Sequence, residues 1–463
     1  MLNHTNLILA LNTVQHAMNS CTPLAIYWLP LIPIALFLIS RNYHHCAETH
    51  PKGCRKLGLP HNKTNLHDEF DPKYSKGVPE NHTDKQGLAS WRIKALFAYP
   101  IKSCAGVELD VAEVVPTGFA HDRQFCFAEY ITPKSSGAGD EPSQQPHWTA
   151  RTLRDGELCK MALIRPEIWV PDPTANDYST ELEEVKSHGV MIIHYPRVPG
   201  TGIRSLPAKL GMALGLISKD LFFRVPLSPP EDTKSIYPST PVKIWKDFPL
   251  AYDYALHLPP SLHHFLNPAG TRGPLTLFRV NPAHHREIFR NAPPKEQLGF
   301  QAVTGFADAY PLHLLNIASV QDVAGKCKSD TPKLTIRRFR ANIIVQGPAA
   351  YEEDHWKRVR ICSSRSGAEK GGVEVHTVCR TIRCRLPNVD PDTGVRHPVE
   401  PDRTLKKWRR VDRGDLTNAA LGMQAVPAVP EFRVWVGDEV EILETGEHCY
   451  IKMLKPGEEV EGV

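Results

Sequence analysis

Proline is the residue that most limits the fold of this chain, because it occupies 41 of the 463 positions. Each proline inside a helix removes a backbone donor and clashes with the preceding turn, so long helices are disfavoured. Between the prolines, residues 91–99, 107–115 and 125–130 roughly alternate polar and apolar side chains, and turn signals such as Pro116-Thr-Gly118 separate them. Short strands at this spacing predict small β-barrels rather than βαβ units. The expected fold class is therefore α+β and rich in strands.

The second half of the chain predicts a further barrel. A chain of 463 residues is too long for one small core, and the His- and Pro-punctuated stretch over 241–275 marks a domain boundary. Beyond it, residues 312–316 and 342–345 are expected to be buried strands, and Ser319 is expected to cap a short helix. Residues 435–443 have the pattern of a terminal strand that closes a barrel.

The N-terminal region predicts a membrane anchor. Residues 21–40 are almost uncharged and mostly apolar, which is enough helix to cross a bilayer despite Pro30 and Pro33. Residues 1–20 form a tail without Lys or Arg, whereas positive charge follows the apolar segment, so the body is expected to be cytosolic. A cleaved signal peptide is the rival, but its basic start and small-residue cleavage site are missing. Residues 41–89 are expected to be a juxtamembrane linker.

Charge and cysteine content exclude other classes of protein. The net charge of +4 is modest, and basic residues do not interleave with aromatic ones along a stripe, so no nucleic-acid partner is expected. The 11 cysteines form no short-domain disulfide pattern, which favours a reducing compartment. The sequence contains no Cys-x4-Cys-x2-Cys run of the kind that binds an iron–sulfur cluster, so any electrons must come from a partner.

Two cysteines near the C-terminus are candidates for metal binding. Cys379 and Cys384 are separated by a segment that contains Arg380 and Arg383, and a turn-forming Asp-Pro-Asp-Thr-Gly sequence follows over 390–394. Thiolates bind soft metals, neighbouring arginines lower the pKa of a thiol, and the turn fixes where Cys384 points. Two ordinary thiols are the alternative.

Two upstream loops carry polar side chains suited to an anion. Lys102 and Ser103 follow a strand on a loop, and can present an ammonium, a hydroxyl and a backbone donor to a phosphate, or form an ordinary surface pair. Arg123 offers a guanidinium, although a local ion pair with Asp122 would use it equally well.

A later segment adds two more polar candidates. Arg340 and Asn342 are expected to alternate on one face of a strand and to reach the same ligand. The intervening Ala341, like Phe339, should point into the core.

Several motifs together resemble the MOSC family, and within it the amidoxime-reducing component type of mitochondria. The resemblance runs from about residue 90 to about residue 443. It rests on the Cys384 segment and on these further stretches: Tyr99-Pro-Ile-Lys-Ser-Cys-Ala-Gly106, His121-Asp-Arg-Gln-Phe125, Thr149-Ala-Arg151, Phe306-Ala-Asp-Ala-Tyr-Pro311, Arg338-Phe-Arg-Ala-Asn-Ile-Ile-Val345 and Val436-Gly-Asp-Glu-Val440. It implies a MOSC N-terminal β-barrel domain over 90–245 and a MOSC β-barrel catalytic domain over 270–445.

The resemblance also implies the roles of the site residues. Cys384 matches the catalytic, molybdenum-ligating cysteine, and Cys379 is then a spectator. Relatives usually carry a small hydroxyl residue where Tyr310 stands, so no phosphate contact is assigned to that tyrosine. The residues implied to hold the pterin cofactor are Lys102, Ser103, Arg123, Asp308, Arg340, Asn342 and Arg383.

By the same resemblance, the chain would be a molybdenum-cofactor-dependent oxidoreductase that converts N-hydroxylated compounds such as amidoximes into amines and water. Electrons would come from NADH through cytochrome b5 reductase and cytochrome b5. The outer mitochondrial membrane is the implied location, although the anchor would also serve in the endoplasmic reticulum. One alternative is a sulfur-carrier or cofactor-transfer protein with a persulfide on Cys384, normally paired with a pyridoxal-phosphate cysteine desulfurase. Another is a pterin-binding membrane scaffold without catalysis.

Overall fold

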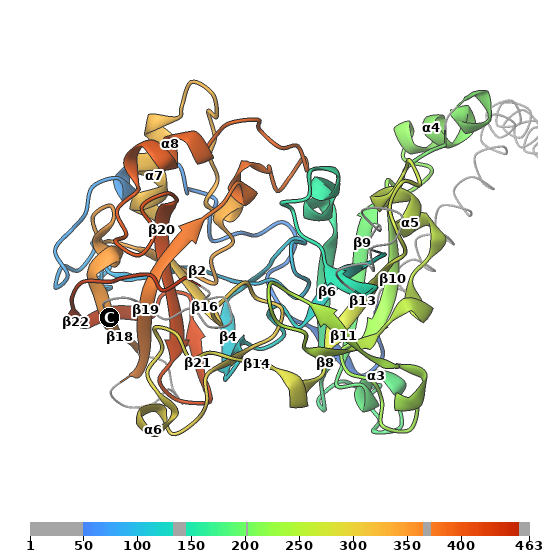
Figure 1. The fold of residues 1–463 in the computed structure, drawn as a ribbon, viewed down its shortest axis with the longest axis horizontal. Coiled ribbons are helices and arrows are strands. Elements are labelled where there is room, and N and C mark those ends of the chain that lie inside the picture. The colour runs from blue at the N-terminus through green and yellow to red at the C-terminus, as the bar shows by residue number, and fades with distance from the viewer. Residues whose placement is uncertain (1–49, 133–144, 201, 364–371, 453–463) are drawn as a thin grey trace, which may run out of the picture.

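The chain is dominated by β-strands that form two barrels lying side by side (Figure 1). The computed structural model describes residues 50–132, 145–200, 202–363 and 372–452. The strand-rich fold class is therefore confirmed. The predicted anchor over 21–40 and the tail over 1–20 lie outside the described residues. Within the described ranges, no helix combines the length and apolar character needed to cross a membrane.

The first barrel is closed by five strands and has a separate sheet beside it. In order around the barrel they are β11 (Ser239–Lys243), β12 (Leu250–Asp253), β13 (Leu275–Val280), β6 (Phe125–Ile131) and β7 (His147–Ala150). The neighbouring four-stranded sheet has the order β1 (Cys54–Lys56), β8 (Arg165–Pro171), β9 (Val190–Pro196) and β10 (Asp220–Pro226). Helix α5 (Pro260–Leu266) packs Leu262 and Phe265 into the core of this half.

The second barrel is an eight-stranded sheet that closes through an extra pairing of β17 with β2. Its order is β17 (Ile343–Gln346), β16 (Leu312–Asn316), β20 (Ala419–Pro427), β19 (Val373–Arg383), β18 (Trp356–Cys362), β22 (Glu439–Thr445), β2 (Arg92–Ala98) and β3 (Val107–Leu109). Helices α7 (Ile317–Lys326) and α8 (Asp402–Trp408) cover one side (Figure 1). A small sheet of β21 (Phe432–Trp435), β4 (Val111–Val115) and β5 (Gly118–Phe119) completes this half.

Each barrel contains a strand from the sequence range predicted for the other barrel. Strand β2, expected in the first barrel, pairs with β17 through Leu96 opposite Ile343. Conversely, β13 lies beyond residue 270 yet completes the first barrel by pairing with β6. An alternating pattern identifies a strand and its buried face but carries no information on its partner strand. The limits 90–245 and 270–445 therefore do not separate the two sheets.

Two further predictions about the body need correction. Helix α7 begins at Ile317, and the Asn316 side chain caps it by accepting from the backbone N–H of Ala318 at 3.1 Å. Ser319, the predicted cap, lies inside the helix and donates its hydroxyl to Glu353 at 2.7 Å. The described part of the predicted linker, from residue 50, is folded onto the body: Leu66 and Tyr74 are buried in the core beside α7.

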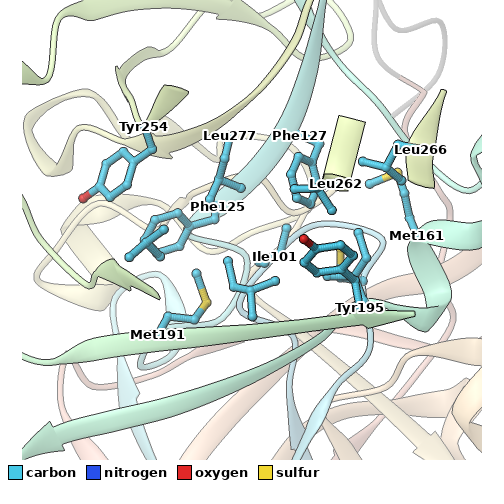
Figure 2. Close-up of a cluster of buried hydrophobic side chains, with 14 of the residues drawn as sticks. Ile101, Phe125, Phe127, Met161, Met191, Tyr195, Tyr254, Leu262, Leu266 and Leu277 are labelled. Atoms are coloured by element: carbon cyan, nitrogen blue, oxygen red, sulfur yellow. The ribbon is translucent and has the colours of Figure 1, made fainter. Parts of the chain in front are cut away.

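A buried cluster in the first half holds two of the candidate loops in place (Figure 2). Ile101 and Phe125 both point into this cluster and are fully buried or nearly so. Ile101 precedes Lys102, and Phe125 comes two residues after Arg123. Packing of these apolar side chains therefore determines where the neighbouring polar residues leave the core.

Candidate functional site

All eight predicted site residues line one cavity of about 430 Å³ between the two barrels. They come from the loops after β2 and β5, from the stretch before β16, from the turn before β17 and from the end of β19. A larger cavity, about 780 Å³, lies alongside, but Arg340 is the single predicted site residue among its described lining. The smaller cavity is therefore the candidate site.

Lys102 and Asp308 form a buried pair in the wall of this cavity. The ammonium of Lys102 donates to the Asp308 carboxylate at 2.5 Å and to the Phe306 carbonyl at 2.9 Å. Burial lowers the pKa of Lys102 to about 8, although Asp308 opposes that shift. Burial disfavours the charge of Asp308, yet Lys102 and Arg154 hold its pKa well below the usual value. The predicted anion-binding lysine is thus built into the cavity and is not a surface residue.

Arg123 and Arg340 lie against the same aromatic ring. Their guanidinium groups lie 4.9 and 4.2 Å from the centre of the Tyr99 ring. Arg123 also forms the predicted local ion pair with Asp122 at 2.5 Å and donates to the Arg340 carbonyl at 3.0 Å. Arg340 donates to the Cys104 carbonyl at 2.6 Å. Tyr99 therefore packs against both guanidinium groups beside the cavity.

The expected strand over Arg340 and Asn342 is wrong in its details. Arg340 ends a short 3-10 turn, η7 (Ile336–Phe339), with a left-handed φ of 57°, and β17 begins only at Ile343. The Asn342 amide donates to the Phe97 carbonyl at 3.0 Å and accepts from the His313 N–H at 3.1 Å. Asn342 therefore ties strands together at the cavity wall. The expectation that Phe339 and Ala341 enter the core is confirmed.

Arg154, which the sequence did not single out, makes the closest polar contact to Cys384. Its Nε donates to the Cys384 Sγ at 3.1 Å, and its Nη2 donates to Asp308 at 2.6 Å. Burial opposes the charge of Arg154, but Asp308 and Cys384 raise its pKa overall. The Trp245 ring lies 4.7 Å from the guanidinium. The Thr149-Ala-Arg151 stretch, which is part of the family resemblance, ends three residues before Arg154. Arg151 itself, however, pairs with Glu129 at 2.7 Å.

The other groups near Cys384 are arranged differently from the prediction. Arg380, expected to keep Cys384 ionised, instead donates to the His448 carbonyl at 3.1 Å and pairs with Asp412 at 3.4 Å. Arg383 does lie on the cavity wall, and burial lowers its pKa to about 10. Cys379 is fully buried, and burial raises its pKa to about 12, as befits a thiol outside the cavity.

The turn after Cys384 forms as predicted. The Asp390 carboxylate accepts from the backbone N–H groups of Asp392 and Thr393 at 2.9 and 3.0 Å. Gly394 supplies a left-handed φ of 67°. Arg338 donates to Asp390 at 2.5 Å and ties the turn to η7. The chain on both sides of Cys384 is therefore fixed, by β19 before it and by this turn after it.

The cavity wall has an excess of positive charge, and several of its buried polar atoms lack a hydrogen-bond partner among the described residues. Its described lining contains seven Lys or Arg residues against two Asp. Four buried side-chain atoms of this lining have no hydrogen-bond partner among the described residues: Arg340 Nη2, Arg383 Nε, His313 Nε2 and Thr381 Oγ1. Unpaired buried polar atoms are costly, and the two guanidinium nitrogens among these four are donors, so their presence in this wall fits an anionic, oxygen- and nitrogen-rich ligand. Cys384 adds the thiolate that a soft metal carried by such a ligand would need.

Comparison with known protein families agrees with this geometry. The family model of the MOSC domain matches residues 301–441, and that of the MOSC N-terminal beta barrel domain matches residues 90–167. Among curated relatives, "Mitochondrial amidoxime-reducing component 1" of Homo sapiens is 34% identical over 131 residues, 28% of this chain and 33% of that protein. "Mitochondrial amidoxime reducing component 2" of Rattus norvegicus is 37% identical over 107 residues, 23% of this chain and 28% of that protein.

A relative whose name indicates a different role also matches. "Molybdenum cofactor sulfurase" of Oryza sativa subsp. japonica is 29% identical over 149 residues, 30% of this chain and 16% of that protein. The matched part of the chain spans about a third or less of the length of each of these relatives. The resemblance expected from the sequence motifs is confirmed at the level of the two domains.

Proposed function

We propose that this chain, which carries a MOSC domain and a MOSC N-terminal β-barrel domain, is a molybdenum-cofactor-dependent oxidoreductase that reduces N-hydroxylated compounds. One observation carries the proposal: the Cys384 thiol, 3.1 Å from the Arg154 guanidinium, lines a cationic cavity whose wall includes the unpaired guanidinium nitrogens of Arg340 and Arg383. The names of the amidoxime-reducing relatives support the same class of reaction.

The residues divide between holding the cofactor and holding the metal. Cys384 would ligate molybdenum, and Lys102, Ser103, Arg123, Arg340 and Arg383 would bind the anionic pterin. When bound, the cofactor supplies the two-electron couple that, with two protons, turns an N–OH group into N–H and water. Asp308 holds Lys102 and Arg154 in place, because it accepts from both at 2.5 and 2.6 Å. Arg154 in turn positions the Cys384 sulfur.

Electron supply and location belong to the same proposal. Because nothing in the sequence indicates an iron–sulfur cluster, we propose cytochrome b5 and NADH-cytochrome b5 reductase as the electron donors. A membrane anchor over 21–40 would keep the catalytic body cytosolic, at the outer mitochondrial membrane in preference to the endoplasmic reticulum. The names of the relatives, which are mitochondrial components, support a mitochondrial location.

Metal and pterin analysis of the purified full chain beside Cys384→Ala tests the assignment. We expect about one molybdenum per wild-type chain, from a single ligand set, and at least a tenfold loss in the variant. NADH-dependent amidoxime reduction with the two donor proteins should be lost in parallel. Cys362→Ala is the matched control, since Cys362 is half-buried and lies outside the cavity lining. Wild-type protein that takes up no molybdenum from available cofactor would contradict the proposal, and full activity of Cys384→Ala would contradict the role of Cys384.

The match to a molybdenum cofactor sulfurase favours one alternative, a sulfur-carrier or cofactor-transfer protein. In that role Cys384 would carry a persulfide, supplied by a separate pyridoxal-phosphate cysteine desulfurase. Mass spectrometry of the freshly purified, alkylated protein distinguishes the two functions. A 32 Da increase on the Cys384 peptide, about the mass of one sulfur atom, in metal-free protein would favour sulfur transfer. Unmodified Cys384 together with bound molybdenum would favour the reductase.

A further inference from the structure

An exposed apolar stripe lies on the excursion between strands β9 and β10, none of whose residues is in the described lining of the cavity. This excursion contains a short 3-10 turn, η3 (Ile203–Ser205), and helix α4 (Leu206–Ala213). Figure 1 shows α4 at the outer end of the molecule, beyond β9, β10 and α5. Four large apolar side chains spaced three or four residues apart are exposed there: Ile203 84%, Leu206 57%, Leu210 61% and Leu214 63%.

The stripe is the outer face of a folded unit. On the inner side, the Ile217 side chain closes against Gly211, where an added Cβ would come within 2.7 Å of it. The backbone N–H groups of Leu216 and Ile217 both donate to the Gly211 carbonyl, at 2.8 and 3.0 Å. The helix is therefore held by its small-residue side, which leaves the leucines pointing outward. An apolar stripe of this kind on a protein surface marks a contact site.

The charge around the stripe identifies what it contacts. The exposed Lys209 and Lys219 and the half-buried Arg197 accompany the leucines, and the sequence from 197 to 219 contains no Asp or Glu. A short helix with leucines on one face and basic residues beside them suits the interface of an anionic bilayer, where the leucines enter the acyl boundary and the cations meet lipid phosphates.

The sheet that carries α4 is also the place where the chain enters the described body. Strand β1 pairs with β8, and β8 pairs with β9, which leads into the excursion. Nine residues separate position 40, the end of the apolar segment, from His50, whose ring packs on Trp169 of β8. Position 40 and His50 are ten residue steps apart, at most about 36 Å, so a bilayer that held the proposed anchor over 21–40 would lie within that reach of this sheet.

We propose that α4 and its flanking residues bind the surface of an anionic phospholipid bilayer, as a second membrane contact beside the anchor proposed above over 21–40, on which the orientation argument rests. With two contacts the body cannot rotate freely about its tether, so the bilayer fixes the direction in which the cavity opens. This contact is independent of the chemistry in the cavity.

Hydrogen exchange measured by mass spectrometry on the full chain tests the contact. The chain is bound to vesicles of phosphatidylcholine with about one-third phosphatidylserine, and compared with the same chain in detergent. We expect amides over 203–217 to exchange at least about fivefold more slowly on vesicles, while amides of α8 are unchanged. Leu206→Glu combined with Leu210→Glu should abolish the slowing, and pure phosphatidylcholine should weaken it.

The matched control is Leu256→Glu combined with Leu416→Glu, which alters leucines of similar exposure, 55% and 69%, outside the excursion. This control should keep the full slowing. The proposal is overturned if exchange over 203–217 is equal in vesicles and detergent, or if the chain does not bind vesicles. It is also overturned if protection survives Leu206→Glu with Leu210→Glu, or if a lipid-free dimer shows the same protection, which would assign the stripe to a second copy.

Discussion

The short turn η7 separates two groups of basic residues whose partners differ. Before the turn ends, Arg337 pairs with Asp392 and Arg338 pairs with Asp390, each at 2.5 Å. We call these four residues the brace. After the turn, Arg340 faces the cavity, and within the described ranges neither it nor Arg383 forms a salt bridge. The same short stretch of sequence thus supplies both neutralised and unneutralised guanidinium groups.

Structural and functional charges in this protein differ in whether a carboxylate partner is present. A buried ion pair that is broken on one side destabilises the fold, because the remaining charge is left without a partner. A buried cation without a carboxylate partner instead costs stability in the empty protein and is repaid when an anion binds. Charge in the brace should therefore matter for folding, and charge in the cavity wall should matter for binding.

The largest effect is expected when the brace is broken. Arg338→Met removes a side chain that donates to Asp390 and to the Pro387 and Asn388 carbonyls. We expect the free energy of unfolding to fall by about 2 to 3 kcal/mol, measured by urea denaturation of the cofactor-free protein. Arg337→Met is the matched control, because its pair with Asp392 is largely exposed and should contribute about 0.5 kcal/mol. Equal losses from the two variants would remove the distinction between a buried and an exposed brace pair.

A substitution in the cavity wall is expected to reduce stability less than Arg338→Met does and to reduce cofactor binding more. Arg383→Met removes a buried charge that has a single hydrogen bond among the described residues, to the Phe339 carbonyl at 2.9 Å. The free energy of unfolding of the cofactor-free protein should change by no more than about 1 kcal/mol. Molybdenum and pterin per chain, measured by elemental analysis and pterin fluorescence, should fall about tenfold, since a charge-assisted contact is lost. A variant that loses stability as Arg338→Met does, yet keeps its cofactor, would reverse the comparison.

The sequence predicts most of this site because most of the site residues lie in recognisable motifs. The eight predicted residues lie in short motifs whose neighbours share the resemblance, and all eight line one cavity. Arg154, Trp245 and His313 were missed because they lie in a loop, in a turn and on an inward strand face without a distinctive pattern. The placement of β2 in the second barrel was also missed, since the pairing depends on a partner nearly 250 positions away, Leu96 opposite Ile343.

Lys102 tests the distinction between brace and cavity wall more closely, because it lines the cavity yet has a carboxylate partner, Asp308. Burial lowers its pKa to about 8, so its positive charge is present below pH 8 and is lost as the pH rises through that value. If this charge holds the pterin anion, cofactor retained per chain should fall several-fold between pH 7 and pH 9. Lys102→Arg should remain loaded at pH 9, because a guanidinium keeps its proton there.

Lys94→Arg is the control for this pH profile, since Lys94 pairs with Asp68 at 2.8 Å outside the cavity lining and should leave the profile of the wild type unchanged. If cofactor retention by the wild type does not change with pH, Lys102 resembles the brace residues, because its carboxylate partner already neutralises it. A profile shared by the wild type and Lys102→Arg would instead assign the pH dependence to another group. Retention that falls in the wild type and in Lys94→Arg, but not in Lys102→Arg, would show that pairing with Asp308 positions the ammonium without preventing it from binding an anion.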